Sequence, residues 1–218
     1  MNYFVREVFV TLQGEGARAG SKAVFVRFAG CNLWDGLEAH RSRGTGPCAT
    51  WCDTDFFRGE PHDLARLLGA MDAAWPRGDG PRWCVLTGGE PTLQVDAALV
   101  AGLHGAGWLV AVETNGTVDA PAVRACDWVC LSPKRGTAHA TLKAPAHEVK
   151  VVLPGGEAGG WTDHELAALS VDHPRAALFV QPQDGPGREA NLAHCVAFVM
   201  DHPAWRLSVQ VHKIVGLP

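Results

Sequence analysis

Short apolar segments recur along the whole chain, and most are followed by residues whose apolar positions have a helical spacing. The apolar segments predict β-strands at residues 5–12, 23–30, 82–88, 108–115, 127–133, 147–154, 176–182 and 205–212. Apolar residues three and four apart predict helices at 62–75, 92–106, 119–125, 162–170 and 187–202. Thr162 and Glu165 have the spacing of a capping box, which indicates that a helix begins there.

The order of these elements indicates the fold class. Strands that are apolar along nearly their whole length, and that alternate with helices, are typical of a parallel sheet covered by helices. A closed eightfold barrel typically has about 250 residues, whereas this chain has 218, of which residues 31–60 form one extended loop. We therefore predict an α/β fold, an incomplete and open TIM-like barrel of parallel strands with helices outside, in a single domain over residues 1–218.

Composition and charge exclude several classes of protein. Hydrophobic residues make up 47% of the chain and charged residues 19%, with a formal net charge of -4 and no run of basic residues. This charge pattern predicts no nucleic-acid partner. No apolar run approaches the roughly 18–20 residues that cross a bilayer, and the first residues do not resemble a signal peptide. We therefore expect a cytoplasmic protein without a membrane partner.

The seven cysteines fall into two groups. Cys84, Cys126, Cys130 and Cys195 lie in apolar contexts and are expected in the core, because a free cysteine behaves as a small hydrophobic residue. The other three are Cys31, Cys48 and Cys52, in the loop that follows the strand at 23–30.

Three clustered thiolates suit an iron–sulfur cluster better than structural zinc, which is normally closed by four protein ligands. A four-iron cluster held by Cys31, Cys48 and Cys52 leaves one iron free to bind a small molecule. A zinc-binding interaction module remains the alternative from another class.

A second motif, LTGGEP at 86–91, follows the next predicted strand and opens a helix. Its glycine pair fits a place where backbone approaches a ligand closely. A strand-end cysteine triad followed by GGEP resembles the radical S-adenosylmethionine (SAM) superfamily. That superfamily commonly spaces its cysteines C-x3-C-x2-C. Here sixteen residues separate Cys31 from Cys48 and three separate Cys48 from Cys52.

Within this superfamily the chain resembles the 7-carboxy-7-deazaguanine synthases along nearly its whole length, and a long insertion after the first cysteine is known in that family. The matching segments are FVTLQGEG (9–16), VFVRFAGCNLW (24–34), CDTDF (52–56), LTGGEP (86–91), VETNG (112–116), SPK (132–134), KVVLP (150–154), VQPQDGP (180–186) and VHKIVGLP (211–218).

The resemblance implies a catalytic [4Fe-4S] cluster on Cys31, Cys48 and Cys52, and SAM bound on the open iron. The residues expected to contact SAM are Trp51, Gly89, Glu113, Asn115, Ser132, Pro133, Lys134, Gln181, Pro182, Gln183 and Asp184.

The substrate implied is 6-carboxy-5,6,7,8-tetrahydropterin. Arg27 lies on an apolar strand, where an arginine must be paired or face a ligand, and a carboxylate is its natural bidentate partner. The full set expected to contact the pterin is Leu12, Gln13, Gly14, Glu15, Arg27, Thr87, His212 and the terminal carboxylate of Pro218.

A magnesium ion is also expected, with the Thr54 hydroxyl as its protein ligand and Asp53 behind it, since Mg²⁺ prefers oxygen ligands and keeps several waters. The alternative is that Asp53 and Thr54 only form local turn hydrogen bonds.

The reaction implied is a radical ring contraction of the pterin to 7-carboxy-7-deazaguanine with loss of ammonia, catalysed by a lyase in queuosine and deazapurine biosynthesis. SAM would be regenerated as a cofactor. The expected partners are an electron donor such as flavodoxin and a second copy in a homodimer. The nearest rival function is another radical SAM activity, such as activation of a glycyl-radical enzyme.

Overall fold

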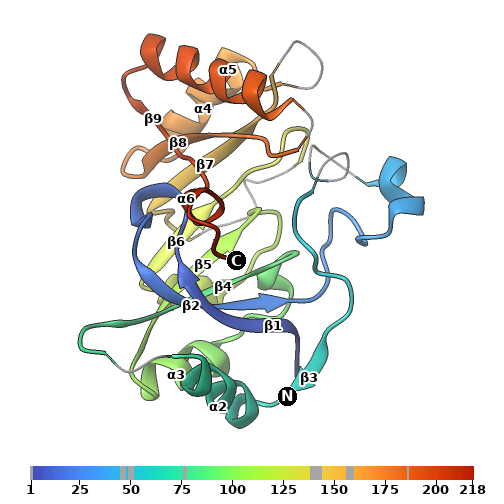
Figure 1. The fold of residues 1–218 in the computed structure, drawn as a ribbon, viewed down its shortest axis with the longest axis vertical. Helices are drawn as coiled ribbons and strands as arrows, with labels where there is room; N and C mark the ends of the chain where they lie inside the picture. The colour runs from blue at the N-terminus through green and yellow to red at the C-terminus, as the bar shows by residue number, and fades with distance from the viewer. Residues whose placement is uncertain are drawn as a thin grey trace.

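The computed structural model describes residues 2–44, 48, 52–75, 78–137, 144–155, 160–185 and 187–218. These residues form one nine-stranded sheet in the order β3-β1-β2-β4-β5-β6-β7-β8-β9 (Figure 1). The strands are β1 (Tyr3–Leu12), β2 (Lys22–Phe28), β3 (Glu60–His62), β4 (Arg82–Gly88), β5 (Trp108–Thr114), β6 (Trp128–Leu131), β7 (Glu148–Leu153), β8 (Ala177–Pro182) and β9 (Trp205–Leu207).

The sheet is open and mostly parallel, as predicted. All neighbouring strands from β2 to β9 pair in parallel, and the two edge strands, β3 and β9, do not pair with each other in the described part of the chain. β1 and β3 are the exceptions, because β1 runs antiparallel to both β2 and β3. The connection at residues 13–21 between β1 and β2 is shorter than the dozen or so residues that a parallel crossover needs.

Helices follow several of the strands. The α-helices are α2 (Leu64–Ala74), α3 (Ala97–Gly105), α4 (Asp163–Asp172), α5 (Arg188–Asp201) and the short α6 (Val211–Ile214). The 3-10 helices are η1 (Gly16–Arg18), η2 (Glu38–Arg43), η3 (Pro91–Leu93) and η4 (Pro121–Ala125). The capping box of Thr162 and Glu165 is confirmed at the start of α4.

Three predicted elements differ from the structure. The helix expected at 92–106 is divided, because the Asp96 side chain caps a new helix by accepting from Leu99 N. The helix expected at 119–125 is the 3-10 helix η4. The strand expected at 205–212 ends at Leu207, and α6 begins at Val211. In addition, β3 has no alternating pattern, and it forms by pairing with the first residues of β1.

The two faces of the sheet have different roles because side chains alternate along a strand. On β2, Val24, Val26 and Phe28 are buried in the main core, against which the helices pack. Arg27 points the other way, into a cavity, and its strand register places it beside Thr87 of β4. The four cysteines expected to be buried are all buried, and Cys84, Cys126 and Cys195 belong to the main core. Cys130 is buried on the other face of β6, beside Lys150 and Glu148.

Candidate active site

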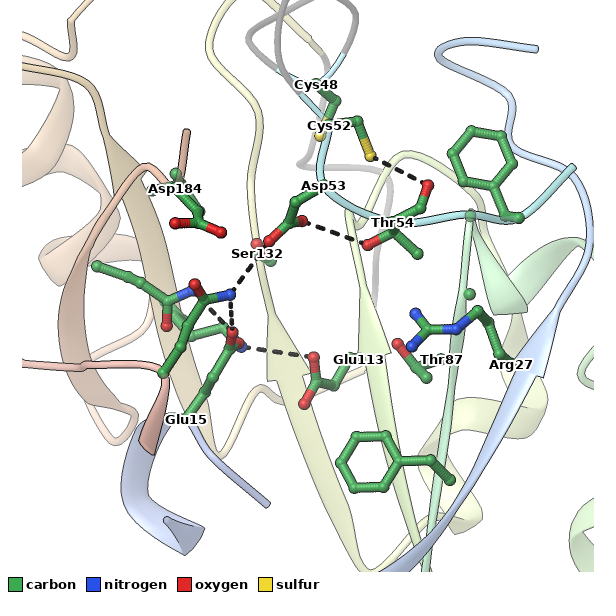
Figure 2. Close-up of a pocket in the computed structure, with 18 of the residues that line it drawn as sticks. Glu15, Arg27, Cys48, Cys52, Asp53, Thr54, Thr87, Glu113, Ser132 and Asp184 are labelled. Carbon is green, nitrogen blue, oxygen red and sulfur yellow. Dashed lines mark hydrogen bonds and ion pairs between the residues drawn. The ribbon is translucent and has the colours of Figure 1, made fainter. Parts of the chain in front are cut away.

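A cavity of about 540 Å³ lies at the carboxyl ends of the parallel strands (Figure 2), where α/β folds place their ligands. It brings together predicted residues from segments far apart in the sequence. Those that line it are Gln13, Glu15, Arg27, Cys31, Cys48, Cys52, Thr54, Thr87, Gly89, Glu113, Asn115, Ser132, Pro133, Lys134, Gln181, Pro182, Gln183, Asp184, His212 and Pro218.

Three predicted residues are not among them. Trp51 lies outside the described residues. Leu12 ends β1 and does not line the cavity, and neither does Gly14. Gly14 lies directly behind the wall, where an added Cβ would be 1.8 Å from Nδ1 of His212. Only glycine fits this contact, which lets the C-terminal segment approach the end of β1.

Cys31, Cys48 and Cys52 form one end of the cavity as half-buried free thiols. A hydrogen bond from Cys52 lowers the pKa of Cys48 to about 6, and the same contact raises the pKa of Cys52. Cys31 and Cys52 pack against Trp34 and Phe56, whose rings meet edge to face with centroids 5.8 Å apart. Three thiols on a partly apolar wall are a donor set that fits an iron–sulfur cluster.

Among the described residues, no three His, Cys, Asp or Glu side chains lie close enough together to hold a metal ion. Cys31, Cys48 and Cys52 share a wall of the cavity, but they do not converge on one point. Gly89 packs behind this wall, since an added Cβ would lie 2.1 Å from the Gly30 carbonyl oxygen and 2.8 Å from Cys31 Cβ. The GGEP segment and the first cysteine are thus in direct contact.

Glu90, the acid of GGEP, is fully buried and is not part of the cavity lining. Its carboxylate accepts hydrogen bonds from the hydroxyls of Thr92, at 2.5 Å, and Thr114, at 2.7 Å. It also accepts one from Asn115 N at 2.7 Å. Glu90 therefore joins the end of β4 to the end of β5 and holds Asn115 at the cavity.

A buried ion-paired group forms the opposite end of the cavity. The Lys150 ammonium contacts the carboxylate of Glu15 and lies 3.4 Å from that of Glu113. Gln13 donates to Glu113 at 2.7 Å, and Gln181 donates to Glu15 at 2.9 Å.

The charges of this group are set by their neighbours. Burial alone would raise the pKa of Glu15, but Lys150 and the side-chain amides of Gln181 and Gln210 lower it below its ordinary value. Burial alone would lower the pKa of Lys150, but Glu113 and Glu15 raise it well above its ordinary value. A carboxylate flanked in this way is ionised and ready to accept N–H groups from a ligand.

Lys150 was not predicted, although the sequence contains a signal for it. It lies in EVKVVL, an otherwise apolar strand, and is as much an exception there as Arg27 is in AVFVRF. Arg27 is paired, because its Nε donates to Glu7 at 2.6 Å, and its side chain also lines the cavity.

The residues from 208 to 218 close one side of the cavity. Val211 N donates to the Gly14 carbonyl at 2.9 Å, and the Thr11 hydroxyl donates to the main-chain oxygen of Pro218 at 2.9 Å. Burial lowers the pKa of His212 below its ordinary value. Burial would lower the pKa of Lys213 as well, but two aspartates raise it.

Comparison with known proteins identifies the family. No protein-family model matches the chain. Curated relatives named 7-carboxy-7-deazaguanine synthase are 46% identical in Bordetella pertussis and 44% identical in Caulobacter vibrioides, with the whole of both chains covered in each case. The chain belongs to the 7-carboxy-7-deazaguanine synthase family. This confirms the resemblance seen in the sequence motifs and favours it over an activase or a zinc module.

The fold agrees with this family. The crystal structure of QueE from Escherichia coli superposes with a TM-score of 0.68, covering 97% of this chain and 95% of that one at 24% identity. This supports the open, mostly parallel architecture. In the described part of the chain no helix is long and apolar enough to cross a membrane.

Proposed function

We propose that the chain is a radical SAM lyase that converts 6-carboxy-5,6,7,8-tetrahydropterin into 7-carboxy-7-deazaguanine and ammonia, in queuosine and deazapurine biosynthesis. The observation that carries this proposal is a single cavity with the three cysteines at one end and Gln13, Glu15, Arg27 and Pro218 elsewhere on its wall. The relatives' names agree with this chemistry.

At the cysteine end, Cys31, Cys48 and Cys52 would hold a [4Fe-4S] cluster. When bound, the cluster and SAM supply the 5′-deoxyadenosyl radical that starts the reaction. Around them, Trp51 and the lining residues Gly89, Glu113, Asn115, Ser132, Pro133, Lys134, Gln181, Pro182, Gln183 and Asp184 would orient SAM. Lys134 is already fixed by donating to the carbonyl and hydroxyl oxygens of Ser132, both at 2.7 Å.

At the other end, the chain's own groups match the pterin. Arg27 presents a guanidinium to the substrate carboxylate. Glu15 would accept N–H groups of the pterin ring, because Lys150 and the amides of Gln181 and Gln210 lower its pKa against the effect of burial.

The remaining pterin contacts come from smaller groups. The hydroxyl of Thr87, the side chain of His212, the amide of Gln13 and the terminal carboxylate of Pro218 would complete the set. Leu12 and Gly14 do not line the cavity, so they would support the pterin site through the backbone without touching the pterin.

The magnesium ion would bind at Thr54, with the substrate carboxylate and waters as further oxygen ligands. Thr54 lines the cavity, and its hydroxyl lies 3.5 Å from Oδ1 of Asp53. An electron donor such as flavodoxin, a homodimer and a cytoplasmic location complete the proposal.

Product analysis tests the proposed reaction. Protein reconstituted under anaerobic conditions would be incubated with the carboxypterin, SAM, Mg²⁺ and a reductant, and the products separated by liquid chromatography and mass spectrometry. We expect 7-carboxy-7-deazaguanine. A cluster-loaded protein that cleaves SAM but forms no deazaguanine would contradict the substrate assignment.

A pair of cysteine variants tests the cluster ligands. Cys48→Ala should give a folded chain that does not cleave SAM. Cys195→Ala is the matched control, because Cys195 is a buried thiol of α5 away from the cavity. It should cleave SAM normally. Retained cleavage by Cys48→Ala would show that another group ligates the cluster.

A further inference from the structure

Lys213, on α6, lies between two carboxylates from distant parts of the chain. Its Nζ is 2.7 Å from Oδ2 of Asp53, in the cysteine-bearing loop, and 2.6 Å from Oδ2 of Asp184, which follows β8. The three side chains keep only 29%, 38% and 26% of their surface exposed. Figure 2 shows Asp53 and Asp184 near one another, at the end of the cavity where Cys48 and Cys52 lie.

The segment that carries Lys213 also contacts the pterin end of the cavity. We call residues 208–218 the C-terminal strap. Within it, Gln210 donates to Asp53 at 3.2 Å and to Glu15 at 2.9 Å. Two hydrogen bonds join the strap to the end of β1. Val211 N donates to the Gly14 carbonyl, and the Thr11 hydroxyl donates to the main-chain oxygen of Pro218. The strap therefore touches both ends of the site.

The charges explain why a cation is needed at this position. Asp53 and Asp184 contact the same nitrogen, so without Lys213 two like charges would face each other in a partly buried place. The other cation near Asp184 is Arg188, at 3.9 Å, and its side chain is 57% exposed. Arg188 has no ion pair with Asp53 in the described residues, so it does not replace the bridge.

We propose that Lys213 is a positioning residue that fastens the Cys52–Thr54 segment to the strap and to Asp184, so that the SAM and pterin ends of the site are coupled. This inference rests on the proposed function and adds a link between its two ligands. A ligand that orders the strap would also order the loop beside the cluster. Because coupling is reciprocal, the pterin would tighten SAM binding by the same factor by which SAM tightens pterin binding.

Two measurements on cluster-loaded protein test the inference. The first is the rate at which a chelator removes iron in the absence of SAM and the carboxypterin. In Lys213→Met we expect this rate to rise about tenfold, since the loop has lost its anchor. The second is the ratio of the SAM dissociation constants without and with the carboxypterin. We expect a ratio of about 5 or more in the unaltered protein and close to 1 in Lys213→Met.

Three further variants make the test specific. Lys213→Arg keeps a cation that contacts both carboxylates. It should therefore keep the iron-release rate and the ratio of SAM dissociation constants of the unaltered protein. Asp53→Asn removes one half of the bridge and should behave like Lys213→Met, which provides a second route if that variant folds poorly. Arg188→Met removes the exposed cation from Asp184 alone and should leave both values unchanged.

The outcomes separate this inference from the proposed function. Unchanged iron release and an unchanged ratio in Lys213→Met would overturn the role of Lys213, as would an equal effect in Arg188→Met. If the unaltered protein does not bind the carboxypterin, the substrate assignment fails, and iron release still decides whether Lys213 anchors the loop.

Discussion

The buried group of Lys150, Glu15 and Glu113 is the most costly arrangement in the site. The Lys150 side chain is 3% exposed, and those of Glu15 and Glu113 are 14% and 19% exposed. Burying charges is unfavourable unless they are paired and hydrogen-bonded. The arrangement persists because every member has a partner, and it leaves one more negative than positive charge facing the cavity. That excess suits a ligand edge rich in N–H groups.

Replacing this lysine tests the pairing. Lys150→Met should lower the free energy of unfolding by about 3–5 kcal/mol, because it leaves two buried carboxylates without their cation. Denaturant unfolding measures the change. Lys22→Met is the control: Lys22 is half-buried and lies 3.9 Å above the Trp75 ring, and a cation–π contact is worth about 0.5–2 kcal/mol. Equal losses in the two variants would show that the buried ion pairs do not determine the cost.

His212 gives the protein a predicted pH dependence. Burial lowers its pKa below 6.5, opposed by Glu15 and Asp53, while Lys213 lowers it further and Glu113 raises it slightly. The unfolded chain therefore binds this proton more readily than the folded chain does. As pH falls from about 7 to about 5, the free energy of unfolding should decrease.

His212→Gln should reduce this decrease, measured by denaturant unfolding at several pH values. His164→Gln, at an exposed position on α4, is the control and should keep the full slope. An identical slope in His212→Gln would show that this residue is not the group responsible.

At the scale of elements, the connections position the site more than the strands do. The GGEP segment carries Glu90 between β4 and β5, and Gly89 lies against the cysteine loop. The connection from β1 to β2 carries Gln13 and Glu15 and is fixed by Glu148 of β7, which accepts from Ala17 N at 2.8 Å. Short, hydrogen-bonded connections of this kind hold functional side chains on a rigid scaffold.

The start of α4 offers a test of an element away from the cavity. The Thr162 hydroxyl accepts from Glu165 N at 3.2 Å, and the Glu165 carboxylate accepts from Thr162 N at 2.7 Å. Thr162→Ala should lower the free energy of unfolding by about 1 kcal/mol, whereas Thr162→Ser should keep most of it. Both should retain the cluster. A loss of iron in Thr162→Ala would show that α4 influences the site.

At the scale of the whole molecule, the C-terminal strap meets the end of the first strand. The end of β1 and the C-terminal strap share the bonds from Val211 to Gly14 and from Thr11 to Pro218. Figure 1 shows the C-terminus near the middle of the molecule, close to β1 and β2. Pro218 and Leu217 line the cavity, so the last residues of the sequence are part of its wall.

A short Gly–Ser tail added after Pro218 tests this placement. The tail moves the terminal carboxylate away from the cavity, so it should weaken carboxypterin binding by about tenfold, equivalent to about 1.4 kcal/mol. Iron content should not change. The same tail placed before residue 2 is the control. Unchanged pterin affinity would place the terminus outside the binding site.

The sequence by itself determined the order of most elements, the family and most of the residues that line the cavity. Apolar runs and helical patterns report burial directly, so the strands other than β3 and the capped helix α4 were predictable, although β9 ends earlier than expected. Motif segments indicated Cys31, Gly89 and Arg27 because each breaks a local pattern or requires a special backbone.

Only the tertiary structure decided how these segments meet. Contacts between residues far apart in the chain decide the antiparallel pairing of β1 and the short strand β3. They also decide the ion pairs of Lys150 with two glutamates and of Lys213 with two aspartates. Such contacts leave no periodic signal, because a buried ion pair is satisfied by the partner that folding brings to it and not by its neighbours in sequence.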